Sequence, residues 1–431
     1  MQVDTQYTGK YYLKSKAVRG NRLYYYLGFL FWPFGLMLAS FRYRHKPWAK
    51  NIFWLFCIYF GFVFIISSEG PDSARYANTL IELSKSDLTF SNLISALYTT
   101  ETNYVDIVQP LITFIVSRFT TNYHVLFAVF AFIFGFFYSR NLWFLLERIN
   151  GKITIVCFIF ILTFALIISV WNINGFRMWT AAQIYLYGML PFLIEGDKKK
   201  LFWTFFSVFV HFSFFFPVAV VFLYLLAGDR LTVYFWFFII ASFITEINIE
   251  SVKEFISSLP DVFRLKLIGY TSEEYTERVK SASESLNWYV PYSSAGVRGV
   301  VYAFSIAAFI KCRNLLKSEK GLLNLFSFSL LFYGFANIAR NIPSGGRFIT
   351  VANLFMFAFI VFILLKTNRN KIFTLLKYLS IPALLLFLIV AIRIGFDYMG
   401  IMTFIGNPFT AIFYEDTVPL IFYVKKLLMA I

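Results

Sequence analysis

The chain has 431 residues, of which 59% are hydrophobic and 14% are charged, and its net charge is +16. Repeated apolar runs near the length of a membrane span, in such a composition, indicate an all-α polytopic membrane protein and exclude a soluble globular enzyme. Because basic residues favour cytoplasmic loops, the positive charge is an orientation signal, and we expect no nucleic-acid partner.

We expect one integral membrane domain over residues 1–431, with about ten to twelve transmembrane helices. The predicted spans are 50–68, 123–145, 153–171, 178–195, 231–248, 298–312, 321–340, 347–366 and 372–394. Residues 23–40 are also apolar, but Gly28, Pro33 and Gly35 interrupt them and basic residues flank both ends. This favours a re-entrant or interfacial hairpin with both ends inside, and the alternative is a true span with the amino terminus outside.

Residues 201–226 are predicted to form a broken hairpin of two short helices. A single span there would place the basic loop 311–320 outside, against the positive-inside tendency. A turn near His211–Pro217 returns the chain to the cytoplasm and leaves the outer segments slightly negative. The triple lysine Lys198–Lys200 then marks the cytoplasmic side.

Three longer segments are expected on the outer side of the membrane. These are the first periplasmic segment, 69–122, the second periplasmic segment, 249–297, and the C-terminal tail, 395–431. Within the first, the moderately apolar stretch 104–119 is predicted to pack as a helix near the membrane surface. We therefore expect a multi-pass protein of the bacterial inner membrane whose active site faces the periplasm.

The predicted outer ends of the helices are rich in arginine. These residues are Arg75, Arg177, Arg298, Arg340 and Arg347. The positive-inside tendency does not explain them, and a guanidinium group binds phosphate oxygens through a planar fork of donors. Such a cluster suits a lipid diphosphate. This group leaves as an anion, and fixed positive charge would stabilise it. For each arginine the competing reading is a snorkelling or acid-paired residue at the interface.

Other polar residues are candidates for catalysis or sugar binding. His211 lies within an apolar segment beside Ser213, where it could act as a base, donate to a phosphate or be a packed core histidine. Asp72 could also act as the base, or it could sit in the first turn of a helix that follows Pro71. Asn174 could bind sugar or cap a helix. The sequence leaves open which of Asp72 and His211 is the base.

The usual signatures of soluble enzymes are missing from the sequence. It contains no Walker loop, dinucleotide fingerprint, nucleophile elbow or zinc-ligand helix, and its three cysteines fall in apolar runs. We therefore expect neither a metal nor a cofactor.

Over residues 50–366 the order of these elements resembles the EpsG-like and Wzy-type O-antigen polymerases. The matching features are Asp72, Arg75 and Tyr76, then Asn174-x-x-Arg177, the lysine cluster, His211-x-Ser213 and Arg347 at the start of a late span. One departure is Met178, which stands where the family usually has glutamine, with Gln183 further on.

The resemblance implies a polymerase that joins oligosaccharide repeat units carried on undecaprenyl diphosphate, at the periplasmic face. Its implied partners are these lipid-linked oligosaccharides, the membrane lipid and a chain-length regulator protein. Two alternatives are a glycosyltransferase that uses a polyprenyl-phosphate sugar and a flippase for lipid-linked oligosaccharides. A flippase would be expected to carry cations at several depths and an internal repeat, whereas the non-cytoplasmic cations here gather at one face.

Overall fold

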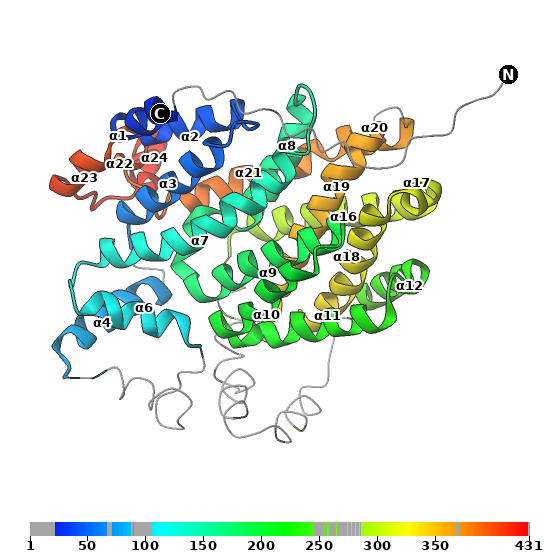
Figure 1. Ribbon diagram of the computed structural model, residues 1–431, viewed down its shortest axis with the longest axis horizontal. Coiled ribbons are helices and arrows are strands. Elements are labelled where there is room, and N and C mark those ends of the chain that lie inside the picture. Colours follow the sequence, from blue (N-terminus) through cyan, green and yellow to red (C-terminus); the bar gives the residue numbers. More distant parts are fainter. Residues whose placement is uncertain are drawn as a thin grey trace.

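The computed structural model describes residues 22–66, 71–87, 89, 106–244, 286–367 and 370–429, with isolated positions between 254 and 284. All regular secondary structure in these ranges is helical, which confirms the all-α prediction (Figure 1). The helices up to residue 200 are α1 (Arg22–Phe31), α2 (Pro33–Arg42), α3 (Ala49–Phe62), α4 (Pro71–Lys85), α6 (Val108–Ser117), α7 (Tyr123–Leu146), α8 (Ile155–Ile167), η1 (Val170–Gly175), α9 (Phe176–Glu195) and η2 (Lys198–Lys200).

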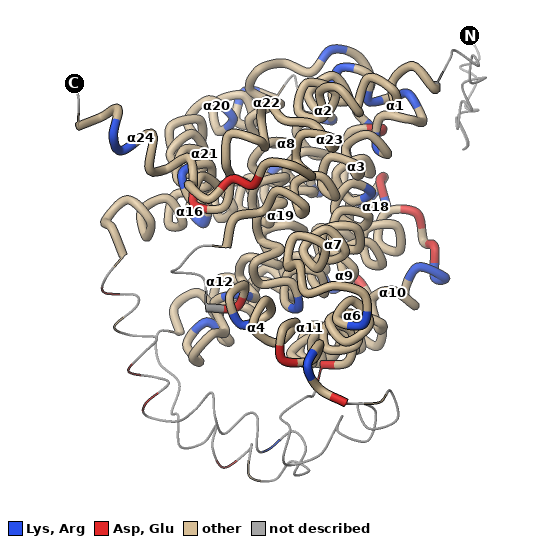
Figure 2. Tube along the Cα trace, turned by 90° about the vertical axis from the view of Figure 1, so that its left-hand side faces the viewer, with Lys and Arg blue, Asp and Glu red and all other residues tan. Residues whose placement is uncertain are grey.

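The second half of the chain continues with helices of similar lengths. They are α10 (Leu201–Val210), η3 (Phe212–Phe214), α11 (Phe215–Ala227), α12 (Leu231–Ser242), α16 (Tyr289–Lys311), α17 (Arg313–Ser318), α18 (Lys320–Ala339), α19 (Arg347–Lys366), α20 (Lys371–Leu379), α21 (Ile381–Gly395), α22 (Met402–Ile405), α23 (Pro408–Phe413) and α24 (Leu420–Met429). Charged residues lie mostly at the margins of the trace, and long uncharged stretches run through its middle (Figure 2).

Six stretches of the described chain are long and apolar enough to cross a membrane, so the protein is membrane-integral. They are Tyr123–Leu146, Ile155–Glu195, Tyr289–Lys311, Lys320–Ala339, Arg347–Lys366 and Lys371–Gly395. Four shorter apolar helices accompany them, among them α3, which stops at Phe62 although the predicted span continued to residue 68. The expected number of ten to twelve spans is therefore not established.

The stretch Ile155–Glu195 contains two helices, because the chain reverses direction at η1. A short connection joins the end of α7 to the start of α8, and the Tyr138 hydroxyl of α7 donates to the Ala165 carbonyl near the end of α8, so the chain runs back along α7. Phe130 stacks on Phe176 at one end of α7, and Arg148 pairs with Glu195 at the other. The helices α7 and α9 are consequently parallel, with α8 antiparallel to both.

This arrangement defines two ends of the bundle. The first, which we call the site end, holds the start of α9, and α4 and α6 lie there side by side (Figure 1). The second, the lysine end, holds η2 and the ends of α7 and α9. Along α9, 18 residues separate Arg177 from Glu195, which at about 1.5 Å per residue places the two ends roughly 27 Å apart.

The broken hairpin predicted for 201–226 is present as α10, η3 and α11. The helix α10 stops at His211, whose backbone is extended with φ −149° and ψ 117°. After the break, Phe216 contacts Phe348 near the start of α19, and the Tyr224 hydroxyl donates to the Asn324 carbonyl near the start of α18. The Asn324 side chain donates to the Leu193 carbonyl near the end of α9, so α18 begins at the lysine end, and α19 starts after its far end, at the site end. The helix α11 therefore returns towards the lysine end.

Residues 23–40 also form a hairpin, with its break at Trp32 between α1 and α2. The Tyr25 ring stacks on Trp48 at a centroid distance of 3.8 Å and contacts Tyr43, so the two outer ends of the hairpin meet. At the tip, the Trp32 indole N–H donates to the Phe404 carbonyl. Residues 23–40 therefore form two short helices and not one continuous helix, and their placement relative to the membrane stays a prediction.

The C-terminal tail packs back onto the site end. Ile65 donates its backbone N–H to the Tyr398 carbonyl, and a Cβ at Gly395 would lie 3.1 Å from the Trp171 ring of η1. The predicted span 372–394 is divided at Ser380 into α20 and α21. Most of the second predicted periplasmic segment, 249–297, lies outside the described residues, as does 90–105 of the first.

Candidate functional site

A buried carboxylate at Asp106 joins two of the residues that the sequence analysis selected. Its Oδ2 lies 2.9 Å from Nη1 of Arg177 and 3.1 Å from Nδ1 of His211. Its Oδ1 accepts a 2.8 Å hydrogen bond from the backbone N–H of Phe212. The Asp106 side chain is 1% exposed, whereas that of Arg177 is 25% exposed, so the cluster is reached from the arginine side.

Three separate elements bring these groups together. Arg177 is in the first turn of α9, directly after η1, and Asp106 precedes α6. His211 ends α10, and the extended backbone there frees the next N–H from any helical partner. Asp106 accepts that N–H, which satisfies a donor that the break in the helix would otherwise leave unpaired.

The geometry fixes the state of the histidine ring. An ionised carboxylate has no proton to donate, so the hydrogen between Asp106 and Nδ1 of His211 belongs to the ring. In the neutral imidazole, Nε2 then carries the lone pair and can accept a proton. This is the arrangement by which a buried carboxylate orients a histidine base in acyl-transfer enzymes.

Tyr76 contributes a buried hydroxyl close to the same arginine. The side chain is 2% exposed, and its Oη has no hydrogen-bond partner among the residues that the structure describes. Burial raises the pKa of Tyr76, and the nearby Arg177 guanidinium opposes that rise. A neutral phenol here can donate to a ligand that enters beside Arg177.

Asp72 and Arg75 pair with one another on the exposed side of α4, three residues apart. Asp72 occupies the first turn of that helix, where a carboxylate is favoured. Its charge acts on Arg177, and it therefore lies at the margin of the Asp106 cluster.

Arg347 and Ser213 lie near the cluster, on α19 and η3. Arg347 is the exposed first residue of α19, and its charge acts on His211 together with that of Arg177. The Ser213 hydroxyl lies 3.8 Å from the Met178 sulfur, so it faces the first turn of α9. The two arginines thus approach one histidine from different helices.

The remaining predicted residues make other contacts. Asn174 donates to the Tyr398 hydroxyl at 2.7 Å and connects η1 with the tail. Arg340 donates to the Ser242 carbonyl at the end of α12, where a cation is favoured, and its charge and that of Arg298 act on Tyr333. Neither of these hydrogen bonds is to a member of the Asp106 cluster.

Asp106 was missed by the sequence analysis. It stands 71 residues before Arg177 and 105 before His211, and nothing in the local pattern ties it to either. Its signal was a single acidic residue just before the apolar stretch Val108–Ser117, in a segment expected near the membrane surface. Among the described residues, no group of three or more His, Cys, Asp or Glu could hold a metal ion.

A comparison with protein families matches the EpsG family model over residues 53–404, most of the chain. The chain belongs to the EpsG family. Members of this family are similar to Wzy-type polymerases, so the protein is a membrane-integral, polysaccharide polymerase-like protein. The matched region contains Asp106, Arg177, His211 and Arg347. Comparisons with curated proteins and with solved structures find no match.

Proposed function

We propose that the protein is a glycosyltransferase that polymerises oligosaccharide repeat units carried on undecaprenyl diphosphate, with the site end of the bundle facing the periplasm. The observation that supports this most directly is the buried Asp106 carboxylate, which joins the candidate base His211 to the candidate phosphate ligand Arg177. The partners proposed from the family resemblance, including a chain-length regulator, belong to the same hypothesis.

In the proposed reaction, a hydroxyl of the incoming unit attacks the anomeric carbon of the growing glycan. Its proton passes to Nε2 of His211, whose ring Asp106 holds in place. The bond between the anomeric carbon and the diphosphate oxygen breaks, and its electron pair leaves with the lipid diphosphate. Arg177 and Arg347 stabilise the negative charge that develops on that leaving group.

The proposed division of labour makes His211 the base and gives Asp72 a lesser role, because Asp72 is already paired with Arg75. Tyr76 is proposed to donate its hydroxyl to the diphosphate beside Arg177. Asn174, Arg298 and Arg340 are proposed to act through packing and not through the substrate.

Deletion of the gene that encodes this protein, followed by gel analysis of surface polysaccharide, tests the proposed polymerase function. Loss of polymerisation should leave a single repeat unit on its acceptor, whereas loss of a donor-sugar glycosyltransferase should shorten or remove the unit itself. Loss of a flippase should leave complete units on the cytoplasmic side of the membrane. Either of the last two results would contradict the proposal.

The mechanism is tested with Arg177→Lys and His211→Gln in the complemented deletion strain. The lysine keeps the charge but lacks the planar fork, and polymer formation should fall on the order of 10²–10³-fold. Glutamine retains hydrogen bonding without a titratable base and should also abolish polymer. The matched control is Arg118→Lys, since Arg118 lies at the same end but donates to the Ser86 carbonyl. Normal polymer from His211→Gln at normal expression would eliminate the base role.

A further inference from the structure

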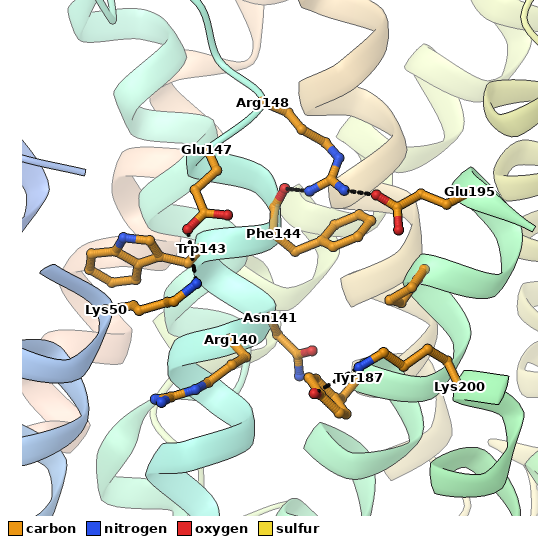
Figure 3. A pocket seen from close by; sticks show the side chains of 11 residues that line it. Lys50, Arg140, Asn141, Trp143, Phe144, Glu147, Arg148, Tyr187, Glu195 and Lys200 are labelled. Carbon is orange, nitrogen blue, oxygen red and sulfur yellow. Dashed lines mark hydrogen bonds and ion pairs between the residues drawn. The ribbon is translucent and has the colours of Figure 1, made fainter. Parts of the chain in front are cut away.

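The lysine end of the bundle contains a basic pocket that the polymerisation site does not use. It has a volume of about 210 Å³ and lies among the start of α3, the ends of α7 and α9, and η2 (Figure 3). Its charged and polar lining includes Lys50, Arg140, Arg148, Lys200, Glu147, Glu195, Asn141 and Tyr187. A single water needs about 10–15 Å³, so the pocket has room for a group the size of a phosphate.

The four cations of this pocket are not balanced by its two carboxylates. Lys50 pairs with Glu147 at 3.2 Å, and Arg148 pairs with Glu195. Both carboxylates are therefore already engaged. Arg140 and Lys200 have no carboxylate partner among the described residues, which leaves two uncompensated positive charges on one pocket.

The two remaining cations are held in place by neutral groups. Arg140 donates to the Asn51 side-chain oxygen at 2.8 Å, and its guanidinium lies 4.2 Å from the centre of the Phe136 ring. Lys200 donates to the Tyr187 hydroxyl at 2.9 Å. Such partners orient a cation without neutralising it, and Arg140 lies inside the apolar helix α7, where an unneutralised charge is costly. An anion in the pocket would offset that cost.

We propose that this pocket binds the phosphate of an anionic membrane lipid. The pocket lies at the ends of membrane helices, where lipid headgroups are found, and the positive-inside tendency predicts that this end faces the cytoplasm. Basic pockets between transmembrane helices on that side are suited to phosphate headgroups. Arg140 adds a guanidinium charge whose Nη1 and Nη2 also donate to Ser139 and Asn51, and Lys200 adds a compact charge.

The test measures phosphatidylglycerol bound to the full-length purified protein by native mass spectrometry, in detergent that contains phosphatidylcholine as the competing neutral lipid. The double variant Arg140→Gln and Lys200→Gln removes the two uncompensated charges. Loss of the charged hydrogen bonds to the lipid phosphate should lower the affinity of the double variant for phosphatidylglycerol by about tenfold or more. The control is Arg42→Gln with Lys199→Gln, which removes the same charge from exposed residues nearby that do not line the pocket.

The proposal is overturned if the double variant retains phosphatidylglycerol as the wild type does, or if the control loses as much. If the double variant does not elute as a single species in size-exclusion chromatography, Lys200→Gln alone is used, because Lys200 lies in the short helix η2 outside the apolar helices. Competition with inorganic phosphate distinguishes the sources of the anion. If inorganic phosphate displaces the lipid from the wild type, the phosphate group is sufficient for binding. If the lipid stays bound, its acyl chains contribute to the affinity.

Discussion

At the scale of single residues, the central feature is the carboxylate of Asp106. It is almost fully buried, and it accepts hydrogen bonds from a guanidinium, an imidazole and a backbone N–H. A charge in such a position is tolerated when it is paired and hydrogen-bonded, and the loss of one partner leaves the other charge uncompensated. Asp106 therefore has a double role, in stability and in the orientation of His211.

The substitution Asp106→Asn tests this double role. The amide is nearly the same size, but it no longer compensates Arg177 or fixes the proton on Nδ1 of His211. We expect polymer formation to fall by about 10²–10⁴-fold, and the free energy of unfolding to fall by roughly 3–5 kcal/mol. Surface polysaccharide gels and thermal unfolding of the purified protein measure the two effects. Glu82→Gln, on an exposed turn of α4, is the control and should alter neither.

At the scale of helices, close contacts between backbones determine how the bundle packs. In α3, a Cβ at Gly61 would lie 2.4 Å from the Phe127 carbonyl oxygen and 2.5 Å from the Ala131 Cβ of α7. In α9, a Cβ at Gly188 would lie 2.2 Å from the Thr204 hydroxyl of α10. Small residues at such crossings let membrane helices approach closely and gain van der Waals contact.

Gly61→Ala and Gly299→Ala make the same change in two environments. At Gly299, in α16, no atom lies within 4 Å of the new methyl group, so the variant should be neutral or stabilised by about 1 kcal/mol through helix propensity. At Gly61, overpacking should outweigh that gain and destabilise the protein by about 1–3 kcal/mol. Thermal unfolding in detergent compares them. Equal melting temperatures for the two variants would contradict the tight α3–α7 crossing.

The hairpin of α10 and α11 gives a second prediction at this scale. Because α11 returns towards the lysine end, a reporter fused after Gly228 should be cytoplasmic, and one fused after Trp288, just before α16, should be periplasmic. Paired alkaline phosphatase and fluorescent protein fusions measure both positions. A periplasmic Gly228 fusion would show that α10 and α11 together cross the membrane once.

At the scale of the whole molecule, the tail closes the bundle by binding the start of α7. Glu415 Oε1 lies 3.0 Å from Nε2 of His124 and accepts a 2.7 Å hydrogen bond from the Tyr123 hydroxyl. The contact with His124, followed by that with Tyr123, holds the pKa of Glu415 below its usual value of 4.5. Residues almost 300 positions apart are thus joined by one carboxylate.

The lowered pKa predicts how this junction responds to pH. The stabilisation by Glu415 is fully present above about pH 4.5 and is lost as the pH falls through the lowered pKa. Glu415→Gln should therefore lower the melting temperature near neutral pH and approach the wild type in acid. The effect should be small because the carboxylate is exposed. Glu82→Gln, whose side chain is also exposed, is the matched control.

The sequence by itself determined the membrane class, the interruption of residues 23–40, the turn near His211–Pro217, and the choice of Arg177 and His211 as candidate site residues. These follow from local properties: long apolar runs form helices, interrupting residues and charge parity locate the breaks, and polar groups in an apolar environment need a reason. The apolar runs and their interruptions are readable within a window of about 20 residues, and charge parity needs only the order of the loops along the chain.

The tertiary structure alone decided which polar groups meet. Asp106 was one acid beside a moderately apolar stretch, and only the structure places it against Arg177 and His211. The structure likewise places Asn174 against Tyr398 and Arg340 against the end of α12. The basic pocket was equally hidden, because its charges come from separate helices and its net charge depends on which pairs form. Pairing across a bundle depends on helix packing, which chain spacing does not encode, and a buried charge takes its role from its partners.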